Sequence, residues 1–164
     1  MVNFKNNRKL DIKKSRNGSG LFSKVNFKKD DVVLEVVGKF ITGDVDEYID
    51  DEIRSNAYRF SRELYISPSG ELADLINHSC KPNSKVVKKN KKLFIEAIGN
   101  INKGDEIVLD YSTIIASDDI WKMKCNCGED VCRKNIGKFK SLPKKLKDLY
   151  ISEGIVPSYI LRIL

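Results

Sequence analysis

The chain has 164 residues and is 41% apolar, which is enough for one sizeable domain and too little for two. Its 30 basic and 23 acidic side chains give a formal net charge of +7, which permits binding to nucleic acid, an anionic surface or an acidic partner. No apolar run is long enough for a membrane span, and no signal-peptide core follows the first residues. We therefore expect a cytoplasmic protein, in which four cysteines indicate metal ligands rather than disulfides.

Lysine residues concentrate the positive charge in two stretches, 81–92 and 134–147. A solvated hairpin and a solvated helix face are sufficient explanations for them. The first stretch has no aromatic residue and the second has only Phe139, so the composition does not favour the stacking of single-stranded bases.

In chain order, residues 1–16 are polar and basic and predict no more than an opening strand. The next stretch, NGSGL at 17–21, places two glycines around a serine, which lets the backbone approach a ligand closely. The β-branched run 32–37 predicts a strand that ends at Gly38. Residues 44–53 have the apolar spacing of a helix, and Asp44 with Glu47 fits a capping pair.

Residues 58–67 predict a short hairpin that leads into the turn at 68–70. Residues 84–111 predict a β-meander, with a turn at 102–105 and a last strand at 106–111. A helix is predicted to start near Pro143 and to stop at Gly154, and Pro157 opens a second short helix. We expect core packing from these two helices, with a lid or a dimer face as the alternative.

The stretch NHSCKPN, at 77–83, contains the only histidine of the chain and one of its four cysteines. The other three cysteines lie in CNCGEDVC, at 125–132, and three thiolates leave a tetrahedral zinc one ligand short. Cys80 is the only candidate for the fourth ligand. The sequence therefore predicts one structural zinc, bound by Cys80, Cys125, Cys127 and Cys132. Two disulfides fit poorly, because C-x-C is too tight for ordinary bridging.

The combination of NHSCKPN, GDEIVLDY at 104–111 and CNCGEDVC resembles the SET-domain protein lysine methyltransferases with a cysteine-rich post-SET tail. The resemblance covers roughly residues 13–140, and the C-terminal extension is similar to those of small, stand-alone prokaryotic SET proteins. It implies a mainly β fold of several short twisted sheets with few helices and a C-terminal pseudoknot. It also implies a SET domain at 1–118, a post-SET zinc segment at 119–140 and a helical extension at 141–164.

The same resemblance implies S-adenosylmethionine as the cofactor and assigns the site residues. Tyr111 is expected to be catalytic, and Tyr58 is expected to border the lysine channel. The expected cofactor-binding residues are Asn17, Gly18, Ser19, Gly20, Leu21, Asn77, His78 and Tyr111. Within this set, His78 is expected to orient the cofactor as a donor and acceptor, not to act as a base.

Three positions depart from the family pattern. Val36 stands where the family has a tyrosine, and Asp74 where it commonly has an arginine. Leu109 stands where a phenylalanine or tyrosine is common. A tyrosine there is thought to hold a water in the channel, so leucine predicts a channel that accepts an already methylated lysine. The alternative is that Leu109 packs into the core and that Tyr58 or another donor holds the water.

Methyl transfer to lysine requires a neutral amine, whereas free lysine has a pKa of about 10.4. A narrow, dry channel and a nearby sulfonium both disfavour the ammonium form. The resemblance therefore implies methylation of lysine on a histone or another basic protein, for which residues 44–52 could form an acidic groove. A eukaryotic source, or delivery to a host, would place the protein in the nucleus or on chromatin.

Two other functions stay open from the residues themselves. A non-catalytic zinc module could bind nucleic acid or chromatin-like partners through the lysine stretches. A small-molecule methyltransferase is a further alternative, but it would lack the peptide groove that the segment at 44–53 suggests.

Overall fold

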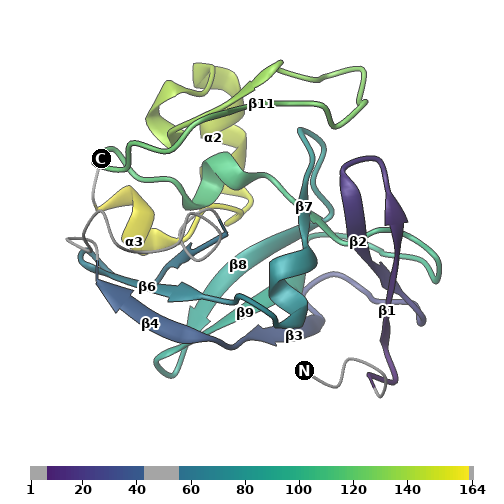
Figure 1. Cartoon of the computed structure of the whole chain (residues 1–164). Coiled ribbons are helices and arrows are strands. Elements are labelled where there is room, and N and C mark those ends of the chain that lie inside the picture. Colours follow the sequence, from purple (N-terminus) through teal and green to yellow (C-terminus); the bar gives the residue numbers. More distant parts are fainter. Residues whose placement is uncertain (1–6, 43–55, 163–164) are drawn as a thin grey trace.

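The computed structural model describes residues 7–42 and 56–162, and Figure 1 traces the whole chain. The described residues form five small β-sheets and short helices, which confirms the expected mainly β fold. The helix and the acidic groove expected within 44–53 lie outside the described residues. Among the helices that the structure describes, none is long and apolar enough to cross a membrane.

An N-terminal hairpin pairs β1 (Leu10–Ser15) with β2 (Gly18–Ser23) in antiparallel register. Gly18 follows the turn with a φ of +94°, a conformation that glycine adopts without strain. Leu21 on β2 is fully buried, so the hairpin is anchored on the main core.

The central sheet has the order β3-β9-β8, with β3 at Val32–Val36, β9 at Lys92–Ala97 and β8 at Ser84–Lys89. The turn between β8 and β9 has positive φ at Asn90 and Lys91, as a tight antiparallel hairpin requires. Leu93 and Ile95 on β9 have no exposed surface and lie in the centre of the largest apolar cluster.

A second three-stranded sheet has the order β4-β6-β5, with β4 at Lys39–Thr42, β6 at Leu64–Ser67 and β5 at Tyr58–Arg59. Its β5–β6 hairpin confirms the one predicted from the sequence. Gly38 precedes β4, and a Cβ at this position would lie 2.0 Å from the carbonyl oxygen of Ser67. Only glycine therefore allows this close approach of the two backbones.

The predicted meander at 84–111 is wrong in its last strand. β10 (Val108–Leu109) pairs in parallel with β7 (Asn77–His78) and not with β9. Residues 106–107 lie against β2 instead, where Ile107 N donates to Leu21 O at 2.7 Å. The side chain of Asn83 binds the same stretch, since its Nδ2 donates to Glu106 O at 2.7 Å and its Oδ1 accepts from Val108 N at 3.0 Å. These two bonds occupy backbone groups that a longer ladder would use.

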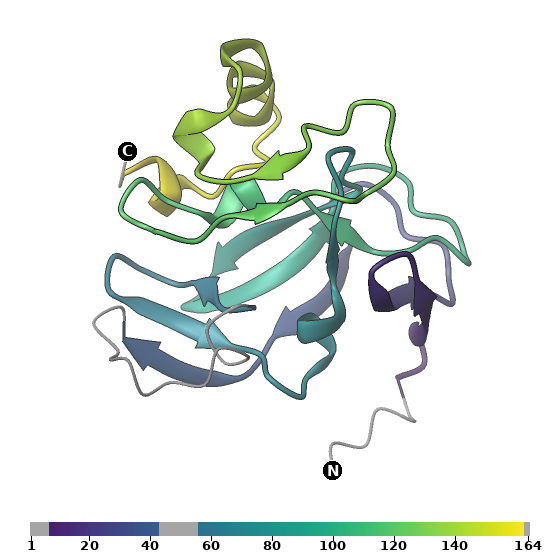
Figure 2. The same cartoon turned by 45° about the horizontal axis from the view of Figure 1, so that its top comes forward.

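Two 3₁₀ turns flank this parallel pair, η2 at Leu72–Leu75 and η3 at Tyr111–Ile114. The C-terminal third then adds β11 (Met123–Lys124), β12 (Asn135–Ile136), η4 (Phe139–Ser141), α2 (Lys144–Ser152) and α3 (Ser158–Leu161). Figure 2 shows this third, coloured from green to yellow, on one side of the sheets.

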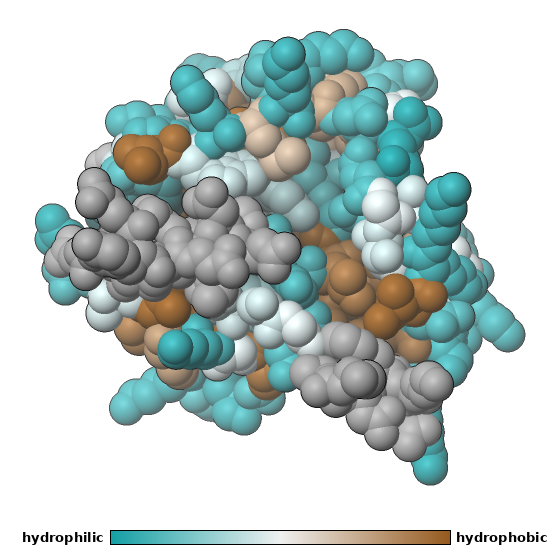
Figure 3. All heavy atoms as spheres, in the orientation of Figure 1, coloured by the Kyte–Doolittle hydropathy of each residue, from teal (hydrophilic) through white to brown (hydrophobic). Residues whose placement is uncertain are grey.

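The predicted C-terminal helices are present at the expected places. α2 begins directly after Pro143, and Gly154, with a φ of +62°, follows its end. Both helices pack through Tyr150 and Ile160 into a second apolar cluster around Phe139. Core packing is thus confirmed as one role, whereas the alternatives of a lid or a dimer face stay predictions. The face in Figure 3 is mostly hydrophilic, with smaller apolar areas between the teal residues.

Candidate active site and metal centre

The four cysteines converge, although 45 residues separate Cys80 from Cys125. All four sulfurs lie within 4.8 Å of one another, and the sulfurs of Cys80 and Cys125 are 3.7 Å apart. Zinc–sulfur bonds of about 2.3 Å imply sulfur–sulfur edges of about 3.8 Å in a tetrahedron. All four cysteines are free of disulfides, so the donor set and its spacing fit the predicted zinc ion.

Local structure explains how the three late cysteines reach this geometry. They lie in the loop between β11 and β12, which the bond from Cys125 N to Lys134 O closes at 2.8 Å. Gly128 lies in the loop with a φ of +80°, and a Cβ there would meet the guanidinium of Arg16 at 2.5 Å. The tip of the β1–β2 hairpin therefore rests against the metal loop.

His78 lies between the metal cluster and the end of β10. Its Nδ1 accepts a hydrogen bond from the backbone N–H of Tyr111 at 3.2 Å, and its Nε2 is 3.4 Å from the sulfur of Cys80. Burial lowers the pKa of His78 to about 4, against an opposing contribution from the nearby carboxylate of Asp110. The ring is thus neutral near pH 7, with the proton on Nε2 facing the sulfur. This arrangement suits an orienting residue and not a base.

Tyr111 and Tyr58 both direct their hydroxyls at the segment around η2. The Tyr111 hydroxyl donates to Ile76 O at 2.6 Å, and the Tyr58 hydroxyl donates to Ala73 O at 2.9 Å. Burial raises the pKa of both phenols well above the ordinary value, with a further contribution from the charge of Asp74. Both tyrosines are therefore neutral hydroxyl groups at physiological pH.

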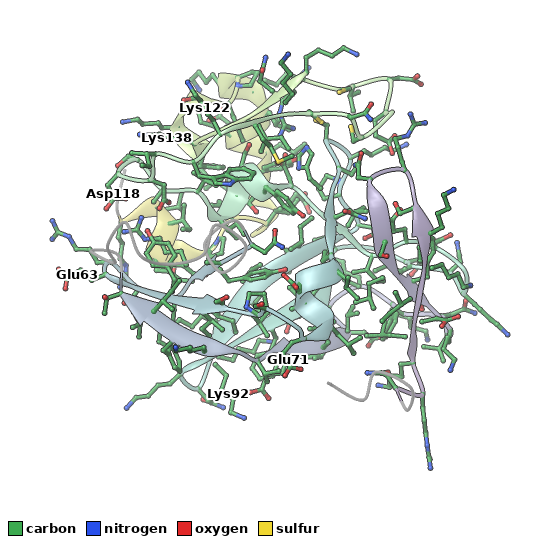
Figure 4. All side chains as sticks on the ribbon, viewed as in Figure 1. Glu63, Glu71, Lys92, Asp118, Lys122 and Lys138 are labelled. Carbon is green, nitrogen blue, oxygen red and sulfur yellow. The ribbon has the colours of Figure 1, made fainter. Side chains whose placement is uncertain are left out.

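These two tyrosines line one cavity of about 710 Å³, which we call the tyrosine cavity. It lies among β4, the β5–β6 hairpin, η2, η3 and the linker that precedes β11. Its lining residues are Ile41, Thr42, Asn56, Ala57, Tyr58, Tyr65, Ala73, Asp74, Ile76, Tyr111, Ile114, Ile115, Asp118, Asp119, Ile120, Trp121 and Lys122. Figure 4 labels Asp118 and Lys122, from the linker, in the upper left of the view and Glu71, just before η2, below its centre.

The GSG segment and the NHSC segment are in direct contact. Asn77 Nδ2 donates to Ser19 O at 3.0 Å and to Glu106 Oε1 at 2.7 Å, and Ser15 Oγ donates to Glu106 Oε2 at 2.9 Å. A Cβ on Gly20 would lie 2.2 Å from the same carboxylate, so glycine makes room for it. Sequence reasoning missed Glu106, because a glutamate beside a turn has no distinctive spacing.

The three departures from the family pattern have local explanations. Val36 is buried in the main apolar cluster. Leu109 is 1% exposed and belongs to that cluster, and it is not among the residues that line the tyrosine cavity. The carboxylate of Asp74 accepts hydrogen bonds from Asn56 Nδ2 at 2.8 Å and Gly70 N at 3.3 Å, so amide donors accommodate its charge.

A cluster of ion pairs around the buried side chain of Arg59, also missed from the sequence, holds the linker at the cavity. The Arg59 side chain is 2% exposed, and its guanidinium bonds Asp118 at 2.5 and 2.9 Å. Asp119 lies 3.2 Å from the same guanidinium and accepts from the Tyr65 hydroxyl at 2.6 Å. The bond from Arg59 holds the pKa of Asp118 below its ordinary value. Linker and β5–β6 hairpin are therefore held together at the cavity wall.

The SET domain family profile matches residues 18–112, so the chain belongs to the SET domain family. The match includes the GSG segment, both tyrosines and the NHSC segment, and it ends before the three late cysteines.

Curated relatives carry histone methyltransferase names. The chain is 31% identical over 140 residues to "Histone-lysine N-methyltransferase TRX1" of Oryza sativa subsp. japonica, which covers 77% of the chain and 13% of that protein. It is 32% identical to "Histone-lysine N-methyltransferase, H3 lysine-4 specific" of Schizosaccharomyces pombe, covering 70% and 13% respectively. It is 35% identical to "Histone-lysine N-methyltransferase 2D" of Homo sapiens, covering 71% and 2%. The chain thus spans a small part of these relatives.

Two solved structures have the same fold. A KRYPTONITE complex with mCHG DNA and SAH has a TM-score of 0.61 and 26% identity, over 80% of this chain and 30% of that one. A KRYPTONITE complex with mCHH DNA, H3(1-15) peptide and SAH has a TM-score of 0.59 and 23% identity, over 77% and 29%.

Proposed function

We propose that the protein transfers a methyl group from S-adenosylmethionine to the side chain of a lysine in a protein substrate. The observation that carries the proposal is the pair of neutral tyrosine hydroxyls at one wall of the tyrosine cavity, directly beside the NHSC segment. The names of the relatives and the SAH in the related crystal structures support it.

We propose that Tyr111 is the catalytic residue and that Tyr58 borders the lysine channel. Each hydroxyl donates its proton to a backbone carbonyl, which leaves its oxygen lone pairs free to accept from the substrate amine. The donor supplies a methyl group on a positively charged sulfur. The neutral lysine nitrogen forms the new bond to the methyl carbon, while the carbon–sulfur bond breaks and its electron pair stays on sulfur. The enzyme contributes mainly alignment and an oxygen dipole near the methyl group.

The cofactor would bind where the GSG and NHSC segments meet. The proposed residues come from the β1–β2 hairpin, from β7 and from η3, and they are Asn17, Gly18, Ser19, Gly20, Leu21, Asn77, His78 and Tyr111. The contact of Asn77 with Ser19 holds the two segments together, and the cysteine cluster fixes the far side of His78. In this proposal, zinc is structural and takes no part in the transfer.

We propose histones or other basic proteins as substrates, in keeping with the names of the relatives. A protein that methylates histones meets its substrate on chromatin, so chromatin is the location that this proposal implies. The boundaries at 118 and 140 stay predictions, because the family match ends at 112.

Incubation with methyl-labelled S-adenosylmethionine and a panel of histones, followed by mass spectrometry, tests the proposal. We expect label on lysine side chains with the wild-type chain and a near-complete loss with Tyr111→Phe. Tight cofactor binding without any transfer to proteins would instead support the non-catalytic zinc module. Label on small molecules alone would support the small-molecule alternative.

A further inference from the structure

The carboxylate of Asp110, the residue before Tyr111, joins three distant parts of the chain. Asp110 is 1% exposed. Its Oδ1 accepts from the backbone N–H of Ser112 at 3.0 Å and from Arg133 Nη2 at 2.7 Å. Its Oδ2 accepts from the hydroxyl of Tyr150 at 2.9 Å. The metal loop and the C-terminal helix α2 therefore meet on one buried carboxylate.

This carboxylate fixes the backbone that carries Tyr111. Asp110 is the N-cap of η3, and Tyr111 is the first residue of that turn. The backbone N–H of Tyr111 is held in turn by His78 Nδ1. A side chain on each side thus determines where the turn starts, so the position of the Tyr111 ring depends on the orientation of the Asp110 carboxylate.

The C-terminal extension contains two tyrosines with buried hydroxyls, and the hydroxyl of Tyr150 is the one that binds Asp110. Tyr150 is 3% exposed and lies on α2, beyond the residues that match the family profile. A second tyrosine, Tyr159, packs against the same apolar cluster, but its buried hydroxyl has no hydrogen-bond partner among the described residues. The two tyrosines can therefore be compared by mutation, because the Tyr150 hydroxyl binds Asp110 and the Tyr159 hydroxyl has no partner among the described residues.

We propose that Tyr150 is a positioning residue for Tyr111. The C-terminal extension holds Asp110 Oδ2, and through Asp110 it sets the location of the Tyr111 hydroxyl. Loss of the Tyr150 hydroxyl leaves a buried carboxylate oxygen unpaired and lets the carboxylate turn toward other donors. A displacement of about 1 Å at a reacting group can lower a rate about 100-fold. The inference rests on the proposed function for its kinetic consequence only.

Steady-state kinetics of Tyr150→Phe, with Tyr159→Phe as the matched control, test the proposal. Both changes delete one buried hydroxyl from the same cluster. We expect Tyr150→Phe to lower kcat at least about 10-fold, with KM for peptide and cofactor within about twofold of wild type. Tyr159→Phe should retain wild-type kcat. The folded fraction and the zinc content of each variant are measured in parallel, so that a loss of fold is not read as a loss of positioning. A folded Tyr150→Phe with wild-type kcat would overturn the proposal.

A second measurement does not depend on activity. The chain has six tyrosines, and 3-fluorotyrosine incorporation gives each a fluorine resonance. The resonance of Tyr111 is assigned as the one that Tyr111→Phe removes. We expect Tyr150→Phe to shift it and Tyr159→Phe to leave it in place, and an unmoved Tyr111 resonance in folded Tyr150→Phe would overturn the proposal. If the wild-type chain transfers no methyl groups, the proposed function fails while this measurement still decides the positioning role.

Discussion

Tyr111 combines a phenol whose pKa is raised by burial with a hydroxyl that already donates its proton. Because the proton goes to Ile76 O, the lone pairs of the oxygen remain available as acceptors in a residue that lines the tyrosine cavity. Such an oxygen can bind an amine and stabilise a methyl group that carries partial positive charge.

We therefore predict that Tyr111→Phe lowers kcat by about 100-fold or more, since alignment and electrostatic stabilisation are both reduced. The change removes one polar atom and little volume, so cofactor affinity measured by calorimetry should stay within about threefold. Tyr159→Phe, which removes a buried hydroxyl that has no hydrogen-bond partner among the described residues, is the control and should retain most transfer. Full activity in Tyr111→Phe would assign the chemistry to another residue.

A second prediction concerns how many methyl groups are added. The expectation based on Leu109 stays a prediction, and the burial of Leu109 favours its alternative, in which Tyr58 holds the water. Both residues belong to the main apolar cluster, but Tyr58 also lines the tyrosine cavity and Leu109 does not. The Tyr58 hydroxyl donates its proton to Ala73 O, so its lone pairs can hold a water. That water would occupy the space that a second or third methyl group needs. Tyr58→Phe should therefore shift the product toward di- and trimethyl-lysine, as mass spectrometry of a long incubation would show. A product distribution equal to that of wild type would contradict this role.

At the scale of elements, the linker before β11 is held to the β5–β6 hairpin by Arg59 and two aspartates. Asp118 is half exposed, whereas the Asp119 side chain is 13% exposed and accepts from Tyr65 and from the backbone N–H of Ala116 at 2.5 Å. The two carboxylates should therefore contribute unequally, because an exposed ion pair is screened by water.

We predict that Asp119→Asn lowers the free energy of unfolding by about 2 kcal/mol, because one buried donor loses its acceptor. Asp118→Asn should cost less than about 1 kcal/mol. Denaturant unfolding of the two variants measures this difference. A release of the linker should also raise KM for a peptide substrate in Asp119→Asn more than in Asp118→Asn. Equal effects on stability would show that the linker is held by other contacts.

The elements that could be predicted from the sequence are those with local signals. The glycine and proline positions around α2 and α3 mark their ends, and the β5–β6 hairpin follows from alternation over a few residues. The pairing of β10 with β7 could not be predicted in this way, since the contacts of this stretch come from β2 and from the Asn83 side chain, which are distant in sequence.

The site residues that could not be predicted from the sequence are likewise those whose roles depend on contacts between distant parts of the chain. The C-x-C spacing indicates a metal loop by itself, and Cys80 follows as the only cysteine left. The contact of Tyr150 with Asp110 joins residues 40 positions apart, and neither has a spacing that distinguishes it from ordinary polar residues. Glu106 and Arg59 are similar, because their roles arise only when strands from different sheets come together.

At the scale of the whole molecule, the cysteine cluster is where the three parts of the chain meet. The NHSC segment contributes Cys80, the β11–β12 loop contributes the other three sulfurs, and the hairpin tip rests on that loop through Arg16 and Gly128. The described residues bury only a small third cluster around these cysteines, with Ile115 and Ile136 as its aliphatic members. Metal binding should therefore supply much of the free energy that joins the C-terminal third to the rest.

We predict that the purified protein contains one zinc per chain and that Cys127→Ser contains far less. Metal binding must compete with protons for the thiolates, so zinc should be released as the pH falls and retained as it rises. Loss of zinc should lower the midpoint of thermal unfolding and weaken cofactor binding together, because His78 contacts both Cys80 and the backbone of Tyr111. Elemental analysis, thermal unfolding and calorimetry measure the three quantities.

Wild-type protein treated with a chelator provides the control for this last prediction. Added zinc should restore its thermal midpoint and its cofactor affinity, whereas the Cys127→Ser protein should recover neither at the same zinc concentration. Zinc at wild-type stoichiometry in a Cys80→Ser, Cys127→Ser double variant would refute the ligand set. Cofactor affinity that is unchanged in zinc-free, folded protein would show that the metal does not support the cofactor site.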